Sequence, residues 1–176
     1  FQGAAIPEEY GGVGYGYLEL CVIAEEIGRC VAPVPFSSSV YLAAEALLQS
    51  GSDAQKETYL PKIASGECIG TLALAEGIGR CTADTCQTTF SDGKVSGTKV
   101  PVPDGDFADL AIVVTQGGLV IVDLNGDGVS REAVTTVDPT RSHGTITFTN
   151  APGELLGDGN PDALATVMNR AAILTA

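Results

Sequence analysis

The sequence predicts an α+β fold: a helical N-terminal unit, an antiparallel β-barrel-like middle domain, and one further helix. Apolar residues recur at helical spacing over residues 17–66. Residues 69–149 instead contain short apolar or alternating runs, separated by turn signals, with no helical segment between them. Helical spacing returns near residue 160 and is still running at Ala176, which indicates a following domain. We therefore expect domains at 1–68, 69–158 and 159–176.

The first helix is expected from Tyr17 to about Val31, after a turn-rich start. Its apolar positions are spaced by four, three and four residues, as one face of a 3.6-residue repeat requires; they are Leu20, Ala24, Ile27 and Val31. Pro33 and Pro35 end this helix, because proline has no N–H to donate and its ring clashes with the preceding turn.

Two shorter helices are expected before the first strand. The serines at 37–39 can cap the second helix, which Gly51 ends. Ser52 followed by Gln55 matches a capping box at the start of the third helix. Pro61 falls inside this third segment, where we expect a break and a fresh turn.

The middle of the chain is expected to form an antiparallel sheet or barrel. Ser91-Asp92-Gly93 is a hairpin signal, and the Gly117-Gly118 pair joins two apolar runs. The expected strands are residues 69–75, 85–90, 94–100, 110–115, 119–124, 129–134 and 145–149. Asn160 or Asp162 is expected to cap the last helix, with Pro161 in its first turn.

Composition narrows the function classes. The chain has 176 residues, of which 44% are hydrophobic, so it can bury a sizeable core. Its formal net charge of −13 argues against nucleic acid and anionic membranes as partners, because both would repel it. The sequence contains neither a transmembrane-length apolar run nor a signal peptide, and it begins at Phe1, so we expect that its natural start is missing.

Cysteine and histidine usage argues against a metal centre. The five cysteines have no C-x-x-C spacing, their number is odd, and the chain contains one histidine. We therefore expect buried, reduced thiols and a cytoplasmic location. His143 has no nucleophile motif or acidic partner that sequence can assign, so we interpret it as structural.

Two glycine-rich stretches resemble parts of known binding motifs. Residues 123–128 match the first half of an EF-hand loop, but position twelve is Val134 instead of a bidentate glutamate, and the flanks are strand-like. A calcium-binding β module is therefore an alternative, and an acidic turn is the preferred interpretation. The glycines between Gly11 and Gly16 follow no strand, so they do not form a dinucleotide fingerprint.

Residues 66–105 organise the chain. An apolar strand at 69–75 ends in an acidic, glycine-rich loop, and the chain returns through a hairpin to Gly97-Thr98-Lys99 and a Val-Pro-Val-Pro run. Two segments connected in this way can place two loops side by side at one end of a sheet, where ligands commonly bind.

These segments resemble the acyl-CoA dehydrogenase family. Residues 60–67 read L-P-K-I-A-S-G-E, against L-P-x-L-A-S-G-E in the family. Residues 74–77 (L-A-E-G) fall on the family's T-E-P segment, and residues 96–103 (S-G-T-K-V-P-V-P) fall on its N-G-x-K segment. Residues 6–12, residues 25–36 and residues 140–148 also resemble family segments. The resemblance covers nearly the whole chain but only the first half of a typical member.

The resemblance implies FAD-dependent α,β-dehydrogenation of an acyl-CoA thioester in lipid metabolism and β-oxidation. It also implies an electron-transfer flavoprotein as acceptor and a homo- or hetero-oligomeric assembly. The catalytic glutamate of the family lies in a C-terminal helical bundle. The last helix here is then the first helix of that missing bundle, so we assign no catalytic residue, and we expect the fragment alone to be inactive.

The resemblance also implies positions for the cofactor and the substrate. Backbone groups of Leu74 and Ala75 would meet the pyrimidine edge of the flavin, in a first loop spanning residues 72–81. Pro101, Val102 and Pro103 would form the second flavin-contacting loop. Cys81 falls near the family's substrate-contacting serine, and no residue is assigned to a metal.

The flavin-facing residues depart from the family pattern. Ala75 lacks the usual hydroxyl, Pro101 replaces an aromatic ring, and Pro103 replaces a hydroxyl near flavin N5; proline also removes two backbone donors. The V-P-V-P run resembles an actinobacterial-type subgroup in which some members form α2β2 assemblies. Alternatives are therefore a non-catalytic partner subunit, or a flavin oxidase or monooxygenase on the same fold.

Overall fold

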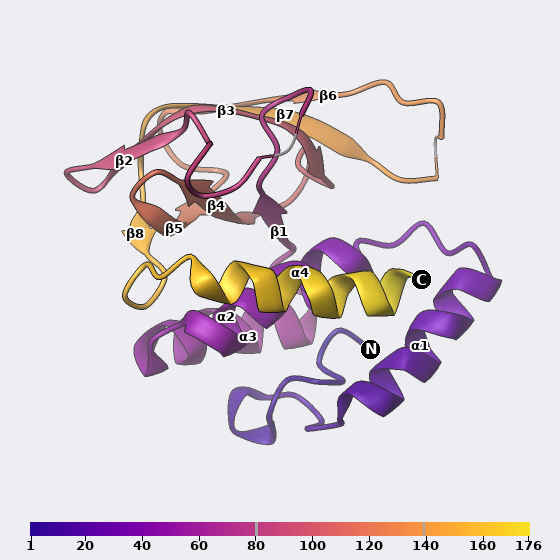
Figure 1. The fold of residues 1–176 in the computed structure, drawn as a ribbon. Helices are drawn as coiled ribbons and strands as arrows, with labels where there is room; N and C mark the ends of the chain where they lie inside the picture. Colours follow the sequence, from indigo (N-terminus) through magenta and orange to yellow (C-terminus); the bar gives the residue numbers. More distant parts are fainter. Residues whose placement is uncertain (80, 139) are drawn as a thin grey trace.

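A layer of helices lies beneath two β-sheets in the computed structural model, which describes residues 1–79, 81–138 and 140–176 (Figure 1). A short 3-10 helix, η1 (Glu8–Tyr10), precedes the helices α1 (Tyr17–Arg29), α2 (Glu45–Ser50) and α3 (Asp53–Ser65). Strands follow, and α4 (Asp162–Thr175) then returns to pack against α2. The predicted α+β class and its order of elements are confirmed.

The strands form two four-stranded sheets that are not closed into one barrel. The first sheet has the order β1-β4-β5-β8, and the second has the order β2-β3-β7-β6. The strands of the first sheet are β1 (Gly70–Ala73), β4 (Leu110–Thr115), β5 (Gly118–Asp123) and β8 (Glu154–Leu155). The strands of the second are β2 (Thr89–Ser91), β3 (Lys94–Pro103), β6 (Val129–Ala133) and β7 (His143–Pro152).

One strand pair differs from the predicted antiparallel arrangement. β1 pairs with β4 in parallel, with Gly70 opposite Leu110 and Ala73 opposite Val113. A parallel pair needs a long crossover connection, and the β2–β3 hairpin with its flanking loops supplies it. The strand expected at 85–90 is reduced to β2, because a turn covers residues 83–85 and residues 86–88 are not in a strand.

The first sheet is buried on both faces. Alternate side chains of β4, such as Ile112, pack with Leu47, Leu60 and Leu72 in a core between this sheet and the helices. The intervening side chains of β4, such as Val113, pack in a second core between the two sheets. This alternation follows from the two-residue repeat of a strand. A third core joins α1, the segment before α2, and α4.

The serines at 37–39 lie inside a helix and do not cap one. They begin η2 (Ser37–Ala44), a π-helical segment that continues into α2, and no side chain caps its N-terminus. Ser38 and Ser39 are buried beneath the sheets, where a polar group needs a partner. Ser38 therefore donates to Asp104, and Ser39 Oγ accepts from the Gly70 N–H at 3.1 Å.

The remaining helix predictions have mixed outcomes. The Ser52–Gln55 capping box is confirmed, since each residue's side chain accepts a hydrogen bond from the other's backbone N–H. Pro61 does not break α3, which runs through it to Ser65. α1 ends at Arg29, two residues before Val31, which is exposed. Asn160 accepts from the Asp162 N–H at 2.9 Å, while Pro161 occupies the N-cap position of α4 without a side-chain cap.

A polar cluster joins α4 to the helical unit. Arg170 of α4 pairs with the buried Glu45 and donates to the Tyr17 hydroxyl at 2.6 Å, and its guanidinium lies 4.6 Å from the centre of the Tyr17 ring. Burial and the hydrogen bond to Glu45 raise the pKa of Tyr17 to about 12. The hydroxyl therefore stays protonated and continues to donate to Glu45.

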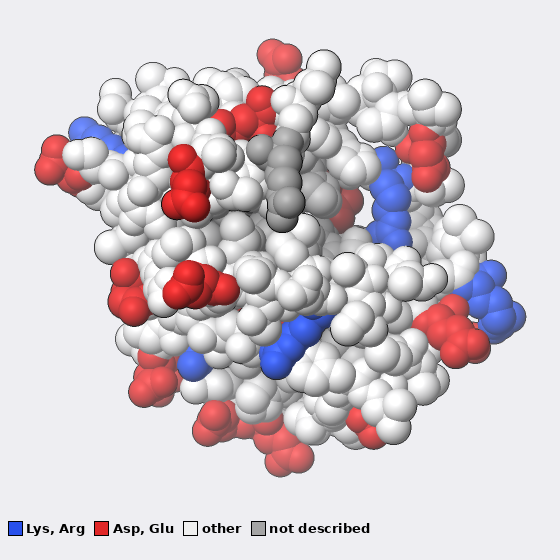
Figure 2. Space-filling view, in the orientation of Figure 1, with Lys and Arg blue, Asp and Glu red and all other residues white. Residues whose placement is uncertain are grey.

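The five thiols are all unpaired, and each lies within the described residues. Contrary to the prediction, only Cys86 is buried, while Cys30 is exposed and the other three are half-buried. In the described part of the chain, none of the helices has the length and apolar character needed to cross a membrane. Figure 2 shows acidic side chains spread over the visible face, with few basic ones among them.

Candidate functional site

The two segments singled out in the sequence lie against each other at one edge of the β-sheets. Val100 N–H donates to the Ala75 carbonyl at 2.8 Å, and Gly77 N–H donates to the Val100 carbonyl at 2.7 Å. Glu76 and Val100 thereby form an isolated parallel bridge. The loop after β1 is therefore tied to the middle of β3 by backbone hydrogen bonds, as the hairpin arrangement predicts.

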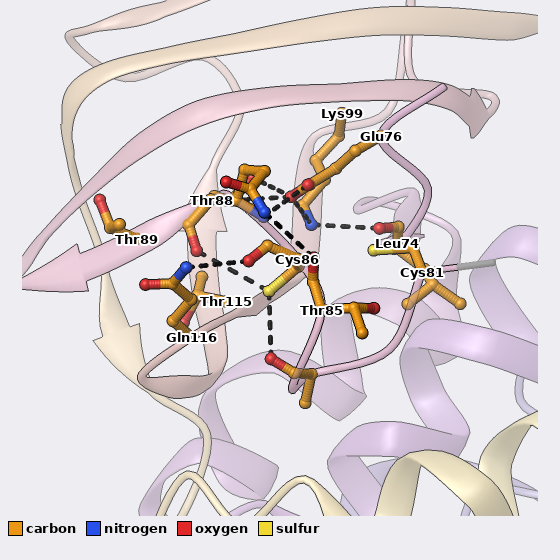
Figure 3. A network of polar contacts seen from close by, with 12 residues as sticks. Leu74, Glu76, Cys81, Thr85, Cys86, Thr88, Thr89, Lys99, Thr115 and Gln116 are labelled. Carbon is orange, nitrogen blue, oxygen red and sulfur yellow. Dashed lines mark hydrogen bonds and ion pairs between the residues drawn. The ribbon is translucent and has the colours of Figure 1, made fainter. Parts of the chain in front are cut away.

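Glu76 is at the centre of the polar network drawn in Figure 3. Its carboxylate accepts from Lys99 Nζ at 2.7 Å, from the Thr88 hydroxyl at 2.6 Å, and from the backbone N–H groups of Gln87 and Thr88 at 2.6 and 2.9 Å. Burial alone would raise the pKa of Glu76, but these hydrogen bonds lower it to about 2. The carboxylate is therefore ionised at any ordinary working pH.

Lys99 is fully buried, with 0% of its side chain exposed. Besides Glu76, its ammonium donates to the Leu74 carbonyl at 3.1 Å. A buried ammonium is costly unless it is paired, and here its partners come from the loop that follows β1. Lys99 thus fixes the backbone of this loop through the hydrogen bond from its buried ammonium to the Leu74 carbonyl.

A cleft of about 660 Å³ opens between this loop and α4. That volume lies within the range of small-molecule sites. The loop contributes Leu74, Ala75 and Cys81, and α4 contributes Leu164 and Met168. Most of these side chains are apolar or small, so the cleft suits an apolar ligand surface with polar groups at its edges.

The predicted site residues divide into two groups. Leu74, Ala75 and Cys81 line the cleft, whereas none of the Val-Pro-Val-Pro residues is among its lining residues. Pro101 is exposed, and the Val102 side chain is buried in the core between the sheets. The Pro103 carbonyl accepts from the Thr71 hydroxyl at 2.6 Å. The predicted second loop forms the end of β3, in which Val102 and Pro103 pair with β7.

The first loop has the features that a flavin edge requires. The carbonyls of Leu74 and Ala75 already accept hydrogen bonds within the protein. The backbone N–H groups of Ala75 and Glu76, however, have no acceptor among the described residues, so the loop keeps donors for acceptor atoms of a ligand. Arg80, within the predicted 72–81 loop, lies outside the described residues. A flavin thus fits the first loop, while Pro101 and Pro103 offer it no N–H.

No sequence motif marks Lys99, Thr88 or Gln87 as the residues that hold the loop. Lys99 appeared only as part of a matching motif, although a lysine within an apolar strand is itself a sign of a buried partner. Thr88 and Gln87 carried no motif at all. Leu164 and Met168 fit the apolar pattern of the last helix, but they line the cleft, and Met168 is 39% exposed.

The Asp123–Gly128 stretch forms a turn between β5 and β6. The Asn125 side chain donates to Asp109 at 3.2 Å and accepts from Arg131 at 3.0 Å. A guanidinium therefore occupies an oxygen that a calcium loop would need. Across the described residues, no three His, Cys, Asp or Glu side chains are grouped to hold a metal.

His143 lies near a second polar cluster, where β3 and β7 meet η2. Asp104 accepts from the Ser38 hydroxyl at 2.5 Å, and Ser142 donates to Asp106 at 2.5 Å. Burial raises the pKa of Asp104, although Ser38 and Arg141 oppose this shift. His143 Nδ1 is buried without a partner among the described residues. No cleft described above includes His143 or Asp104.

Comparison with known proteins gives consistent results. Residues 1–67 match the family model described as "Acyl-CoA dehydrogenase, N-terminal domain". The mitochondrial isovaleryl-CoA dehydrogenase of Arabidopsis thaliana is 47% identical over 118 residues, which are 64% of this chain and 29% of that protein. The chain therefore spans less than a third of the length of this curated relative.

Solved structures extend the similarity to nearly the whole chain. The structure titled "Tcur3481-Tcur3483 steroid ACAD G363A variant" has a TM-score of 0.83 and 34% identity, covering 98% of this chain and 49% of that one. An acyl-CoA dehydrogenase from Bacillus anthracis, solved in complex with FAD, has a TM-score of 0.83 and 26% identity. The match covers 96% of this chain and 32% of the Bacillus anthracis protein.

Proposed function

Because the chain belongs to the acyl-CoA dehydrogenase family, we propose that the complete protein is an FAD-dependent acyl-CoA dehydrogenase. Residues 1–176 then supply one wall of its cofactor and substrate site. The observation that carries this proposal is the cleft between α4 and the loop of Leu74 and Ala75. That loop is fixed by backbone pairing to β3, and its Ala75 and Glu76 N–H groups have no acceptor in the described part of the chain.

The reaction removes a proton from the carbon next to the thioester and a hydride from the following carbon. FAD, when bound, supplies the hydride acceptor. The N–H groups of Ala75 and Glu76 are the donors that this chain offers to the polar edge of the flavin. Leu74, Leu164 and Met168 present apolar surface that would exclude water from the acyl group.

Glu76 is unsuited to be the base of this reaction. A general base works best with a pKa near the working pH, whereas the pKa of Glu76 is about 2. Both of its oxygens also already accept hydrogen bonds. We therefore assign the proton abstraction to a residue outside this chain, in the C-terminal bundle that we propose follows residue 176.

The remaining assignments belong to the same proposal. The substrate is an acyl-CoA thioester, and the electron acceptor is an electron-transfer flavoprotein. The protein acts in β-oxidation in the cytoplasm and works as an oligomer. We also propose domain boundaries near residues 68 and 158, supported by the end of α3 at Ser65, the start of β1 at Gly70 and the start of α4 at Asp162.

The absorption spectrum of the complete gene product tests this function. We expect a flavin band near one FAD per chain, together with bleaching of that band when an acyl-CoA substrate is added anaerobically. A colourless protein that takes up no FAD, either alone or with a partner chain, would rule out a flavin site built on this cleft.

A supporting subunit of a heteromeric enzyme is the second candidate. This candidate is supported by groups that the family pattern has and this chain lacks. Ala75 and Pro103 lack a hydroxyl, Pro101 lacks an aromatic ring, and both prolines lack a backbone N–H. The name of the solved relative, "Tcur3481-Tcur3483 steroid ACAD", joins two designations. A chain that is colourless alone and gains one flavin per pair with its partner would favour this candidate over the first.

A further inference from the structure

We propose that the Glu76–Lys99 ion pair sets the electrostatic potential at the cleft wall and thereby the redox potential of a flavin bound there. Lys99 carries a positive charge behind the Leu74–Ala75 backbone. Glu76 is a positioning residue that cancels this charge and holds it in place. The part about the flavin rests on the proposed function, whereas the part about the cleft wall concerns the protein alone.

The position of Lys99 is the first step. Its Nζ lies 2.7 Å from Glu76 Oε1 and 3.1 Å from the Leu74 carbonyl oxygen. The accepting peptide group joins Leu74 to Ala75, and both residues line the cleft. The ammonium is therefore one peptide group behind the cleft wall. Because the side chain is fully buried, water and salt screen its field less than they screen a surface charge.

The immobility of Glu76 is the second step. Its two oxygens accept four hydrogen bonds, from Lys99, from Gln87 and twice from Thr88. Two of these donors are backbone N–H groups, which cannot turn away. The negative charge is therefore held at a constant distance from the ammonium, and the pair acts on the cleft as a fixed dipole.

Cys81 belongs both to the cleft wall and to the hollow that Glu76 lines. Its side chain lines the main cleft, as Leu74 does, and it also lines a smaller hollow of about 180 Å³ together with Glu76. Burial is the largest effect and raises the pKa of the Cys81 thiol. Lys99 lowers this pKa and Glu76 raises it, so the two charges act on the thiol in opposite directions.

The consequence for a flavin follows from charge. Reduction of a flavin adds negative charge to its ring, so a nearby positive potential favours the reduced form. With Glu76 ionised, most of the Lys99 charge is cancelled. If Glu76 alone were neutral, the uncancelled ammonium would favour both a Cys81 thiolate and a reduced flavin.

The first test uses Cys81 as a probe of potential and requires no flavin. Glu76→Gln removes the charge and keeps the shape, and Glu67→Gln removes an exposed carboxylate at the other end of β1 as a matched control. Alkylation of Cys81 by iodoacetamide is followed across pH by peptide mass spectrometry. We expect Glu76→Gln to increase the rate at pH 7 about threefold or more, and Glu67→Gln to leave it unchanged.

A second variant separates charge from structure. Thr88→Val removes a neutral hydrogen bond to Glu76 and leaves both charges in place. If the alkylation rate depends on potential, Thr88→Val changes it much less than Glu76→Gln does. Equal rates in these two variants, at equal thermal stability, would overturn the proposal, and so would an unchanged rate in Glu76→Gln.

The third measurement is the midpoint potential of the flavin in the complete gene product. We expect Glu76→Gln to raise this potential by about 30 mV. For a two-electron couple, that rise corresponds to a tenfold shift of the equilibrium toward the reduced form. An unchanged potential in a flavin-loaded variant overturns the part about the flavin. A gene product that binds no flavin refutes the proposed function and the part about the flavin together, and the thiol measurement alone then decides the part about the cleft wall.

Discussion

Two segments of this chain, Leu74–Gly77 and Val100–Pro103, resemble the two flavin-contacting segments of the family. They differ in the backbone and side-chain groups that they offer to a ligand. The first is a loop in which Leu74 and Ala75 line the cleft, and its N–H groups at Ala75 and Glu76 lack acceptors among the described residues. The second is the end of a strand that pairs with β7, and two of its residues are prolines. Matching a motif therefore locates a segment, while its backbone hydrogen bonds decide whether it can hold a ligand.

Loss of the Glu76–Lys99 ion pair, which connects the first segment to β3, should have the largest effect on stability. Lys99→Met leaves Glu76 without its cation in a largely buried site, which typically costs about 3–5 kcal/mol of unfolding free energy. Urea unfolding measures this loss. Lys94→Met, at an exposed position of the same strand, is the matched control and should cost about 0.5 kcal/mol or less. Similar losses in both variants would show that the ion pair contributes little.

Acid should loosen the first segment next. The pKa of Glu76 is about 2 in the folded protein, below its ordinary value of 4.5. A lowered folded-state pKa contributes stability above the unfolded-state value and loses it as the pH falls from about 4.5 to about 2. The contribution at neutral pH is on the order of 3 kcal/mol. The unfolding free energy should therefore fall more steeply with decreasing pH in the natural chain than in Glu76→Gln. Equal pH dependence in the two proteins would contradict the lowered pKa of Glu76.

A direct comparison of the segments uses ligand binding. Ala75→Phe places a ring in the cleft and should weaken FAD binding by the complete gene product about tenfold or more, equivalent to roughly 1.4 kcal/mol. Pro101→Ala changes an exposed residue outside the cleft lining and should change the affinity by less than about twofold. Fluorescence titration of the apoprotein measures both. An equal or larger loss in Pro101→Ala would make the second segment the main flavin contact.

The smallest expected effect lies just beyond the second segment. Burial raises the pKa of Asp104, so its contribution to stability is complete at low pH and is lost as the pH rises through the folded-state pKa. Asn removes the buried charge and keeps a partner for Ser38. Asp104→Asn should therefore be neutral at pH 4 and stabilising by about 1 kcal/mol or less at pH 8. Thermal unfolding at the two pH values measures these changes. Stabilisation at pH 4 but not at pH 8 would contradict a raised pKa of Asp104.

Local patterns predicted the elements better than the contacts between them. The Ser52–Gln55 box was readable because a capping box uses residues three positions apart. Ser38 and Ser39 were misread as caps because their partners, Asp104 and Gly70, are distant in sequence. The parallel pairing of β1 with β4 was missed because strand sequences do not encode the direction of a neighbour.

The candidate site shows the same division. The loop after residue 75 could be expected at a ligand site because a strand end followed by a glycine-rich loop is a local signal, and the family resemblance implied Leu74, Ala75 and Cys81, which line the cleft. The partners of Glu76 could not be found in this way, since Thr88 and Lys99 are separated from it by the hairpin. The resemblance implies Val102 at the flavin, whereas a register shift between Lys99 and Val102 in the pairing with β7 places its side chain in the core.

The two-sided burial of β4 has a consequence for unfolding. Ile112 belongs to the core shared with the helices, and its neighbour Val113 belongs to the core between the sheets. One strand is thus a structural member of two hydrophobic cores, and it cannot leave one without exposing the other. The helical unit and the sheets should therefore melt in a single cooperative transition, and limited proteolysis should not release residues 1–68 as a stable fragment.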